Sequence, residues 1–338
     1  MALLVGVDEA GYGPHLGPLV VAAAGLHFSG DALPDPDLWD ALRPHVHKRP
    51  GGASGRVVIC DSKIAYGGTG DLAVLERTVL GFLAASGPRP KSLGKLLQAT
   101  GVNSPAGRDG ADRAMRPWDK PEELALPVAA HAEDIASAAE RLVSALAGLG
   151  AAPGGLWVNA APAARLNRLM DGPRNKAGAL FALAADLLTA VQALGPREPI
   201  HITMDRHGGR RYYAGLLAGA FPMTAVETVE ESPARSRYRL ARGPVVDPHD
   251  RTTAAAAPVD ITVRDRCETW SLPTALASMT AKYVRELHMV QLNAYFRDLV
   301  PGLRPTAGYG RDAWRFLNDV AAARAAVGVP DAAILRSR

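Results

Sequence analysis

Residues 5–18 read VGVDEAGYGPHLGP. An apolar run that begins at Ala2 ends here at two adjacent carboxylates, Asp8 and Glu9, and gives way to glycine and proline. A second apolar run, LVVAAAGL at 19–26, follows at once, so the two runs predict a β-hairpin with a buried face. The chain therefore places two acids at the end of a buried strand, where a cation has to neutralise them.

Further elements alternate downstream of the hairpin. The patterns predict strands over 56–60, 156–159, 200–205, 224–229, 236–240 and 260–263, and helices over 71–85, 176–194, 211–220, 273–299 and 311–327. Strands come first, then mixed strands and helices, then a helical last third. This order predicts an α/β fold with a mixed sheet flanked by helices and a helical C-terminal part.

The segment 86–155 differs in character from its surroundings. It is rich in proline and glycine and carries one clear helix, over 132–149. We expect it to be an insertion on the rim of the sheet, outside the core, which divides the core into residues 1–85 and 156–338. Its residues do not decide between extending a substrate groove and mediating self-association.

Composition narrows the class of protein. The chain has 338 residues, 48% of them apolar, which predicts a globular core, and a net charge of +4 permits a nucleic-acid partner without requiring one. The two cysteines, Cys60 and Cys267, exclude a disulfide scaffold and a cysteine zinc site and suit a reducing cytoplasm. No apolar stretch approaches the roughly 20 residues of a membrane span, and the first strand follows the N-terminus without a signal peptide. We expect a soluble cytoplasmic protein with no membrane partner.

Carboxylates recur where predicted elements end. Asp8 and Glu9 end the first strand, Asp205 ends the strand 200–205, and Glu268 precedes the helix that begins near Pro273. Ligands of α/β sheets bind beyond strand ends, and clustered carboxylates repel one another unless cations neutralise them. Oxygen ligands favour Mg²⁺ or Mn²⁺ over zinc. A helix cap or a surface position would explain any one acid, but explains four acids at comparable places less well.

Five motifs in order are similar to those of the ribonuclease HII and HIII family. They are GVDEAGYGP at 6–14, DSK at 61–63, the strand that ends in Asp205, ASMTAKYVR at 277–285 and GYG at 308–310. The resemblance covers the chain except about 86–155. It implies a ribonuclease H-like mixed sheet and an endonuclease that cuts the RNA strand of RNA–DNA hybrids, using two divalent metals and leaving a 3′-hydroxyl and a 5′-phosphate.

The same resemblance implies the catalytic acids. Asp8, Glu9 and Asp205 match the first three metal-binding acids of the family, and the fourth lies fourteen positions before Lys282, at Glu268. Many members have aspartate there, and the longer glutamate moves the carboxylate outward by one methylene. Two metals about 3.5–4 Å apart can activate a water and stabilise the leaving 3′-oxygen, so no side-chain nucleophile is needed.

A further set of residues matches family positions that contact substrate. The set is Gly11, Tyr12, Gly13, Ser62, Lys63, Ser278, Lys282 and Tyr309. The glycine-flanked turn lets backbone groups approach a 2′-hydroxyl, and Tyr309 matches the tyrosine that stacks on the sugar beside the cut. Helix capping, surface solvation and ordinary core packing are the alternatives for the serines, lysines and Tyr309.

Tyr12 departs from the family, which has arginine or lysine at this position. Tyrosine offers a flat face for stacking but no charge, so we expect a weaker phosphate contact and poor cutting at a lone ribonucleotide in DNA. The alternative is that another arginine, such as Arg210 or Arg266, supplies the contact.

The leading hypothesis is a monomeric hybrid-cutting ribonuclease H of the HII/HIII type. Another ribonuclease H-like nuclease, acting on structured DNA or RNA, remains open. So does a non-catalytic nucleic-acid-binding relative, although retention of all four carboxylates argues against it.

Overall fold

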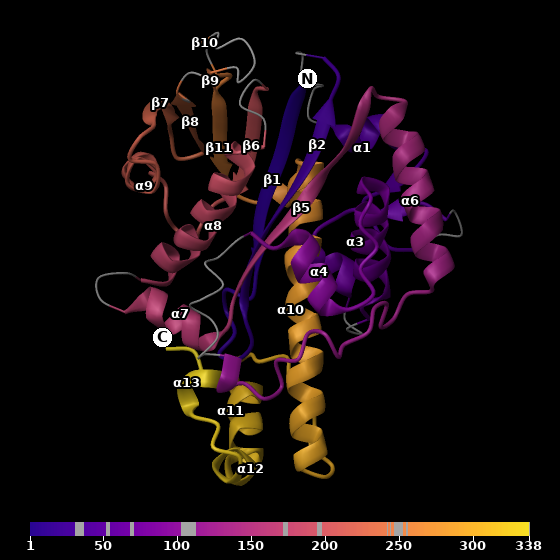
Figure 1. Ribbon diagram of the computed structural model, residues 1–338, viewed down its shortest axis with the longest axis vertical. Coiled ribbons are helices and arrows are strands. Elements are labelled where there is room, and N and C mark those ends of the chain that lie inside the picture. The colour runs from indigo at the N-terminus through magenta and orange to yellow at the C-terminus, as the bar shows by residue number, and fades with distance from the viewer. Residues whose placement is uncertain are drawn as a thin grey trace.

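The computed structural model covers residues 1–338 and is described here outside 31–36, 52–54, 68–70, 103–112, 172–174, 195–197, 242, 244, 247–252, 255 and 338. Its main sheet runs through the centre of the molecule, with helices on both faces (Figure 1). The C-terminal helices lie together at one end, beside the far end of a long helix.

Seven strands of the described residues form the main sheet, in the order β5-β2-β1-β6-β11-β8-β7. Their bounds are β1 Ala2–Ala10, β2 Leu19–Phe28, β5 Ala151–Ala161, β6 Ile200–Asp205, β7 Ala225–Glu231, β8 Arg235–Ala241 and β11 Val259–Arg264. β1 pairs antiparallel with β2 and parallel with β6, and β6 pairs parallel with β11. The outer pairs β2–β5, β11–β8 and β8–β7 are antiparallel. The predicted hairpin and the predicted mixed sheet are both confirmed.

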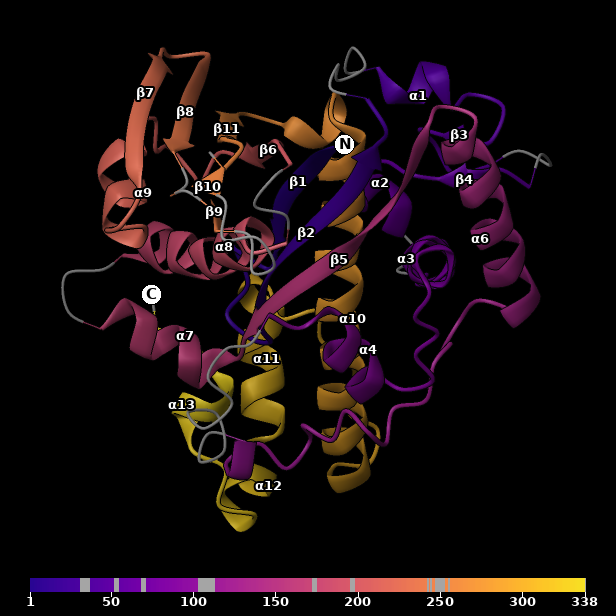
Figure 2. The ribbon, with the colours of Figure 1, turned by 45° about the horizontal axis from the view of Figure 1, so that its top comes forward.

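Helices cover the two faces of this sheet (Figure 2). On one face lie α10 (Leu272–Leu299), α3 (Ala73–Ser86) and α6 (Ala132–Ala147), packed into one apolar core with β2. On the other face lie α8 (Lys176–Gln192) and α9 (Ala214–Ala220), which share a second core with β1, β6 and β11. Burial on both faces explains why β1 and β2 read as nearly continuous apolar runs.

α10 approaches β1 unusually closely at Gly6. A Cβ on Gly6 would lie 2.0 Å from the backbone nitrogen of Thr274, so only glycine fits there. The close approach brings the first turns of α10 against the strand that carries Asp8.

The C-terminal part is helical, as predicted, but the expected helix 311–327 is two helices. α11 (Gly310–Asp319) and α12 (Ala321–Ala326) are separated at Val320, and α13 (Asp331–Ile334) follows. Val320 and Phe316 are buried against α10 residues such as Phe296, so packing on α10, which the helical period does not report, sets the break. Among the described residues, no helix combines the length and apolarity that a membrane crossing requires.

The remaining elements are short. They are α1 (Leu38–Ala41), β3 (Val46–His47), β4 (Val57–Val58), α2 (Ser62–Tyr66), α4 (Leu93–Thr100), α7 (Ala163–Met170), β9 (Val245–Val246), β10 (Thr253–Ala254) and the 3₁₀ turn η1 (Cys267–Thr269). The strand predicted over 56–60 is wrong in extent and in place. Only β4 is extended there, and it pairs with β3 outside the main sheet.

The expectation that 86–155 lies outside the core is wrong. Leu93, Leu96, Leu142 and Leu146 are buried in the same core as α3 and α10. β5 also begins inside this segment and pairs along the length of β2. Residues 103–112 of the segment lie outside the described residues, and the proposed boundaries at 86 and 155 stay a prediction.

Glu76 of α3 joins this segment to the core. Its side chain is 0% exposed, and its carboxylate accepts the backbone N–H groups of Val128, Ala129 and Ala130 at 2.8, 2.6 and 2.7 Å. The Tyr283 hydroxyl of α10 donates to the same carboxylate at 2.7 Å. Four donors satisfy the acceptor positions of one buried carboxylate, a role that no motif or pattern around Glu76 predicted.

Candidate active site

The register of the parallel strands brings the first acids together. Val7 of β1 lies opposite Met204 of β6, so Asp8 and Asp205, the next residue in each strand, end at the same edge of the sheet. Asp205 is also beside Arg264 of β11. Glu268 follows β11 in the turn η1, and the N–H of its neighbour Cys267 donates to Asp205 Oδ1 at 3.1 Å. The structure therefore places all four predicted acids at one end of the central strands.

Each of the two adjacent acids ionises with difficulty. Burial, followed by the charges of Glu9 and Asp205, raises the pKa of Asp8 well above its usual range, and a hydrogen bond from Ser278 partly opposes this. Burial and the charge of Asp205 raise the pKa of Glu9 to about 7, with a further contribution from Glu268. A raised carboxyl pKa means that the environment disfavours the anion.

The other two acids belong to the same electrostatic site. Burial is the main cause of the raised pKa of Asp205 and of Glu268, to which the charges of Asp205 and Asp61 add. Lys63 opposes the shift at Glu268, which places a cation beside the fourth acid. The four carboxylates thus act on one another, although their positions in the chain span 261 residues.

The donor chemistry of this cluster fits a hard divalent cation, because carboxylate oxygens are the ligands that Mg²⁺ and Mn²⁺ prefer. Within the described part of the chain, no three or more histidine, cysteine, aspartate or glutamate side chains form a ready-made metal-binding group. The acids therefore supply the right charge and atoms, but their side chains do not converge as a finished ligand set. Cys267 adds no thiolate, since burial raises the pKa of its thiol.

Ser62, Lys63 and Ser278 lie near the acids, and their contact with a substrate stays a prediction. The hydroxyls of Ser62 and Ser278 are hydrogen-bonded to each other, with their oxygens 3.0 Å apart, and the Ser278 hydroxyl also hydrogen-bonds to the Asp8 carboxylate. Asp61 caps α2 by accepting the Lys63 N–H at 2.8 Å, which leaves the Lys63 side chain exposed. The motif DSK is thus the capped start of helix α2, in which Ser62 is buried against Ser278 and the Lys63 side chain is exposed to solvent.

Lys282 and Tyr309 differ in their availability to a substrate. Lys282 Nζ pairs with Glu286 at 2.7 Å and lies 4.2 Å from the ring centre of Tyr66, so its charge is already engaged. Tyr309 is 45% exposed, and its ring is the nearest group to Gly13, 3.8 Å from where a Cβ would lie. Tyr309 therefore presents a flat face beside the glycine turn.

Glycine is required at the start of this turn. Gly11 has φ +86°, and a Cβ there would lie 2.7 Å from the Pro18 carbonyl oxygen and from the Arg285 side chain. A side chain would be strained in backbone and in space. The turn is consequently a compact backbone loop directly after the two adjacent acids.

Two buried arginines support the turn from inside. Arg285, fully buried, pairs with Glu286 at 2.5 Å and donates to the Ala307 carbonyl at 2.8 Å. Arg336 donates through Nε to the Gly17 carbonyl at 2.7 Å and through Nη1 to that of Gly11. Arg285 lay within a recognised motif, but no signal in the sequence marked Arg336, which comes from the end of the chain.

His207 packs inside the protein. Burial lowers its pKa to about 3, and its ring contacts those of Phe181 and Tyr213. The Tyr213 hydroxyl accepts the His207 backbone N–H at 2.8 Å, whereas Nδ1 of the His207 ring is buried without a hydrogen-bond partner among the described residues.

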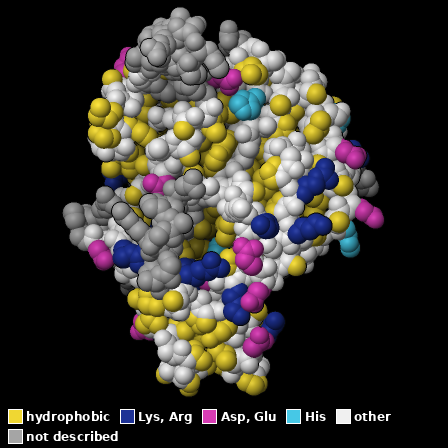
Figure 3. All heavy atoms as spheres, viewed as in Figure 1, with side chains coloured by type: hydrophobic (Ala, Val, Ile, Leu, Met, Phe, Trp, Pro, Cys, Tyr) yellow, Lys and Arg dark blue, Asp and Glu magenta, His cyan; other side chains and the backbone are white. Residues whose placement is uncertain are grey.

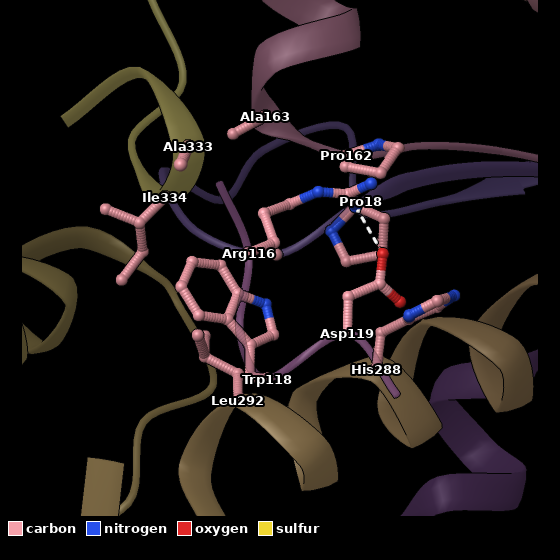
Figure 4. Close-up of a pocket in the computed structure, with 11 residues that line it drawn as sticks. Pro18, Arg116, Trp118, Asp119, Pro162, Ala163, His288, Leu292, Ala333 and Ile334 are labelled. Carbon is pink, nitrogen blue, oxygen red and sulfur yellow. Dashed lines mark ion pairs between the residues drawn. The ribbon is translucent and has the colours of Figure 1, made fainter. Parts of the chain in front are cut away.

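A small cavity of about 30 Å³ separates the back of the turn from the segment 86–155 (Figure 4). Arg116 and Asp119 form a buried ion pair across it at 2.9 Å, next to Pro18 and to His288 of α10. The space is enough for a water. The segment thus reaches the turn that follows the acids, which its expected place on the rim did not suggest.

Figure 3 shows that Lys and Arg side chains on one face are interspersed with Asp and Glu side chains. The described part of that face presents no unbroken basic surface. Attraction of a polyanion would therefore depend on local groups near the site rather than on the net charge of +4.

Fold and site together define an α/β protein with an acidic, oxygen-rich centre at one end of a mixed sheet. No family model matches the sequence, and no curated protein matches it. Solved structures do match. The chain is 13% identical to ribonuclease HII of Archaeoglobus fulgidus, solved in complex with PCNA, over 99% of this chain and 94% of that one, with a TM-score of 0.40.

Two further matches are of the same kind. Ribonuclease H2 from Pyrococcus horikoshii OT3 is 12% identical over 98% of this chain and 92% of that one, with a TM-score of 0.40. Bst-RNase HIII, solved in complex with Mn²⁺, is 15% identical over 99% of this chain and 66% of that one, with a TM-score of 0.41.

Proposed function

We propose that this chain is a metal-dependent endonuclease that hydrolyses the RNA strand of RNA–DNA hybrids and leaves a 3′-hydroxyl and a 5′-phosphate. The observation that supports the proposal most strongly is the group of four carboxylates at one sheet end, each with a raised pKa. Protein architecture keeps such acids together against their repulsion where a cation is to be bound.

Asp8, Glu9, Asp205 and Glu268 would hold Mg²⁺ or Mn²⁺. Bound divalent ions supply an activated water and stabilise the leaving 3′-oxygen. The chain orients the acids for this task, since Ser278 hydrogen-bonds to Asp8 and the Cys267 N–H fixes Asp205.

The substrate would lie across the turn formed by Gly11, Tyr12 and Gly13. The glycine backbone admits the close approach that sensing of a 2′-hydroxyl needs. The exposed ring of Tyr309 beside Gly13 is placed to stack on a sugar or base. Lys63, exposed near Glu268, would contact a phosphate, whereas Lys282 would act through its ion pair with Glu286.

The test is cleavage of three matched, end-labelled duplexes in Mg²⁺ and in Mn²⁺: a long hybrid, a DNA duplex with one ribonucleotide, and plain DNA. We expect cuts only 5′ to or within ribonucleotides, with no product in EDTA. Asp205→Asn should be inactive, and Glu140→Gln, a change at an exposed residue of α6, should match the wild type. Cleavage of plain DNA would favour a different nuclease, and binding without any cleavage would favour a non-catalytic relative.

A further inference from the structure

Two cationic side chains from different segments act on Tyr12. Lys176 Nζ, at the first residue of α8, is 5.2 Å from the centre of its ring. The loop after β6 approaches its hydroxyl, which is 3.7 Å from where a Cβ on Gly208 would lie. Arg210 of the same loop is near enough to oppose the effects of burial and Glu9, which raise the pKa of Tyr12.

These cations have no acidic partner among the described residues. Neither Lys176 nor Arg210 forms an ion pair there, and Arg210 Nε is buried without a hydrogen-bond partner. Beneath them Arg336, 3% exposed, also has a buried Nη2 without a partner.

The cations around Tyr12 are therefore not held by an ion pair among the described residues. Burial lowers the pKa of Arg336 to about 9, with a contribution from Arg285, and burial and Arg336 lower that of Lys176. A cation taken out of water without a partner is costly. An anion beside Lys176 and Arg210 would remove part of that cost.

We propose that Lys176 and Arg210, which both act on Tyr12, form a binding site for a backbone phosphate of the nucleic-acid substrate. The proposal rests on the proposed function and adds which residues hold the strand beside the acids. The Arg210 guanidinium offers several fixed donors, the Lys176 ammonium a mobile point charge, and the Tyr12 hydroxyl one more donor. Arg336 is too buried to touch the ligand and contributes only its charge.

The position of the site follows from the contacts of Tyr12. The charges of both Glu9 and Arg210 act on its hydroxyl, so the phosphate would lie next to the acid cluster. The cationic contact that tyrosine cannot make at position 12 is thereby made by two residues distant in sequence. This is the alternative raised by the sequence, with Lys176 in addition to Arg210.

The experiment measures binding of a labelled RNA–DNA hybrid in EDTA, where cleavage cannot occur, over a range of NaCl concentrations. The variants are Lys176→Met, Arg210→Met, the double variant and Lys176→Arg. Arg297→Met, at an exposed residue near the end of α10, removes the same charge elsewhere. Thermal melts of each variant establish that it is folded, and competition with inorganic phosphate separates a site for free anion from a site for nucleic acid.

The logarithm of the association constant falls as log[NaCl] rises, and each charge removal at the site should make this slope less negative by about 1, and the double variant by about 2. Lys176→Arg and Arg297→Met should keep the wild-type slope. Wild-type slopes for both Lys176→Met and Arg210→Met would overturn the phosphate site while leaving the proposed function intact. Competition by millimolar phosphate as effective as competition by hybrid would also overturn it. A wild-type protein that does not bind the hybrid in EDTA would overturn the phosphate site, whereas the proposed function is decided by the cleavage assay in Mg²⁺ and Mn²⁺.

Discussion

Replacing Glu9 by glutamine should stabilise the metal-free protein while abolishing cleavage. In the fold the pKa of Glu9 is about 7, against 4.5 for an unperturbed glutamate. At about 1.4 kcal/mol per pKa unit, this difference corresponds to about 3 kcal/mol of unfavourable free energy once Glu9 is ionised in both states. Glutamine has nearly the same shape as glutamate but no charge, so the variant avoids this unfavourable free energy. Any hydrogen bonds that the glutamine amide fails to make would reduce the gain in stability.

The pH dependence has a definite sign. The folded protein binds the Glu9 proton more tightly than the unfolded chain does, so the free energy of unfolding falls as pH rises from about 4.5 to about 7. Below pH 4.5 the wild type and the Glu9→Gln variant should have nearly equal free energies of unfolding, because Glu9 is then protonated in both the folded and the unfolded state. At pH 8 the variant should be more stable by about 1–3 kcal/mol.

Urea unfolding in EDTA at pH 5 and pH 8, followed by circular dichroism, measures the difference. Glu140→Gln serves as the control, since Glu140 is exposed on α6 and its change should leave both curves in place. Cleavage of a long hybrid in Mg²⁺ is measured in parallel. A variant that is less stable than the wild type at pH 8, or that cuts at a near-normal rate, would refute the assignment of Glu9 to a repulsive metal-binding cluster.

Three further outcomes are expected. Asp205→Asn should keep a cooperative melt and lose hybrid cleavage; a variant that still cuts at more than about a hundredth of the wild-type rate would count against the two-metal assignment. Glu76→Ala should lower the free energy of unfolding by at least about 3 kcal/mol, because four donors lose their buried acceptor, and a loss below about 1 kcal/mol in urea unfolding would show that water replaces the carboxylate. Tyr12→Arg should leave the ratio of lone-ribonucleotide to long-hybrid cleavage nearly unchanged if Lys176 and Arg210 already hold the phosphate; a large rise in that ratio would restore the expectation drawn from Tyr12 alone.

Local sequence determined the central strands and the first pair of acids. Nearly continuous apolar runs at 2–7 and 19–26 are compatible only with strands buried on both faces, and the glycine and proline between them fix the turn. The acids at 8 and 9 are therefore near a strand end, although β1 continues through both of them to Ala10. The sequence pattern also predicted a helix over 273–299, which the structure shows as Leu272–Leu299.

Tertiary structure alone decided which distant residues share the site. Asp8 meets Asp205 because β6 pairs parallel with β1 in one register, and a period of two cannot choose a register or a neighbour. Short segments were missed for a related reason: α2 spans Ser62–Tyr66, too few residues to show a helical period. Proline and glycine in the segment 86–155 indicate turns, but they do not indicate whether the helices between those turns are buried. The expectation that the segment lies outside the core was wrong for this reason.

The glycine turn illustrates the division most clearly. The motif of this turn is evident in the sequence, but the side chains that hydrogen-bond to the turn or place positive charge beside it come from distant segments. Arg336, which donates to the Gly11 carbonyl, is 325 positions away. Lys176 and Arg210 lie in segments without a motif of their own. Periodicity and turn chemistry act over a few residues, whereas the placement of these cations depends on how whole helices pack on the sheet, and that packing is settled only when the chain has folded.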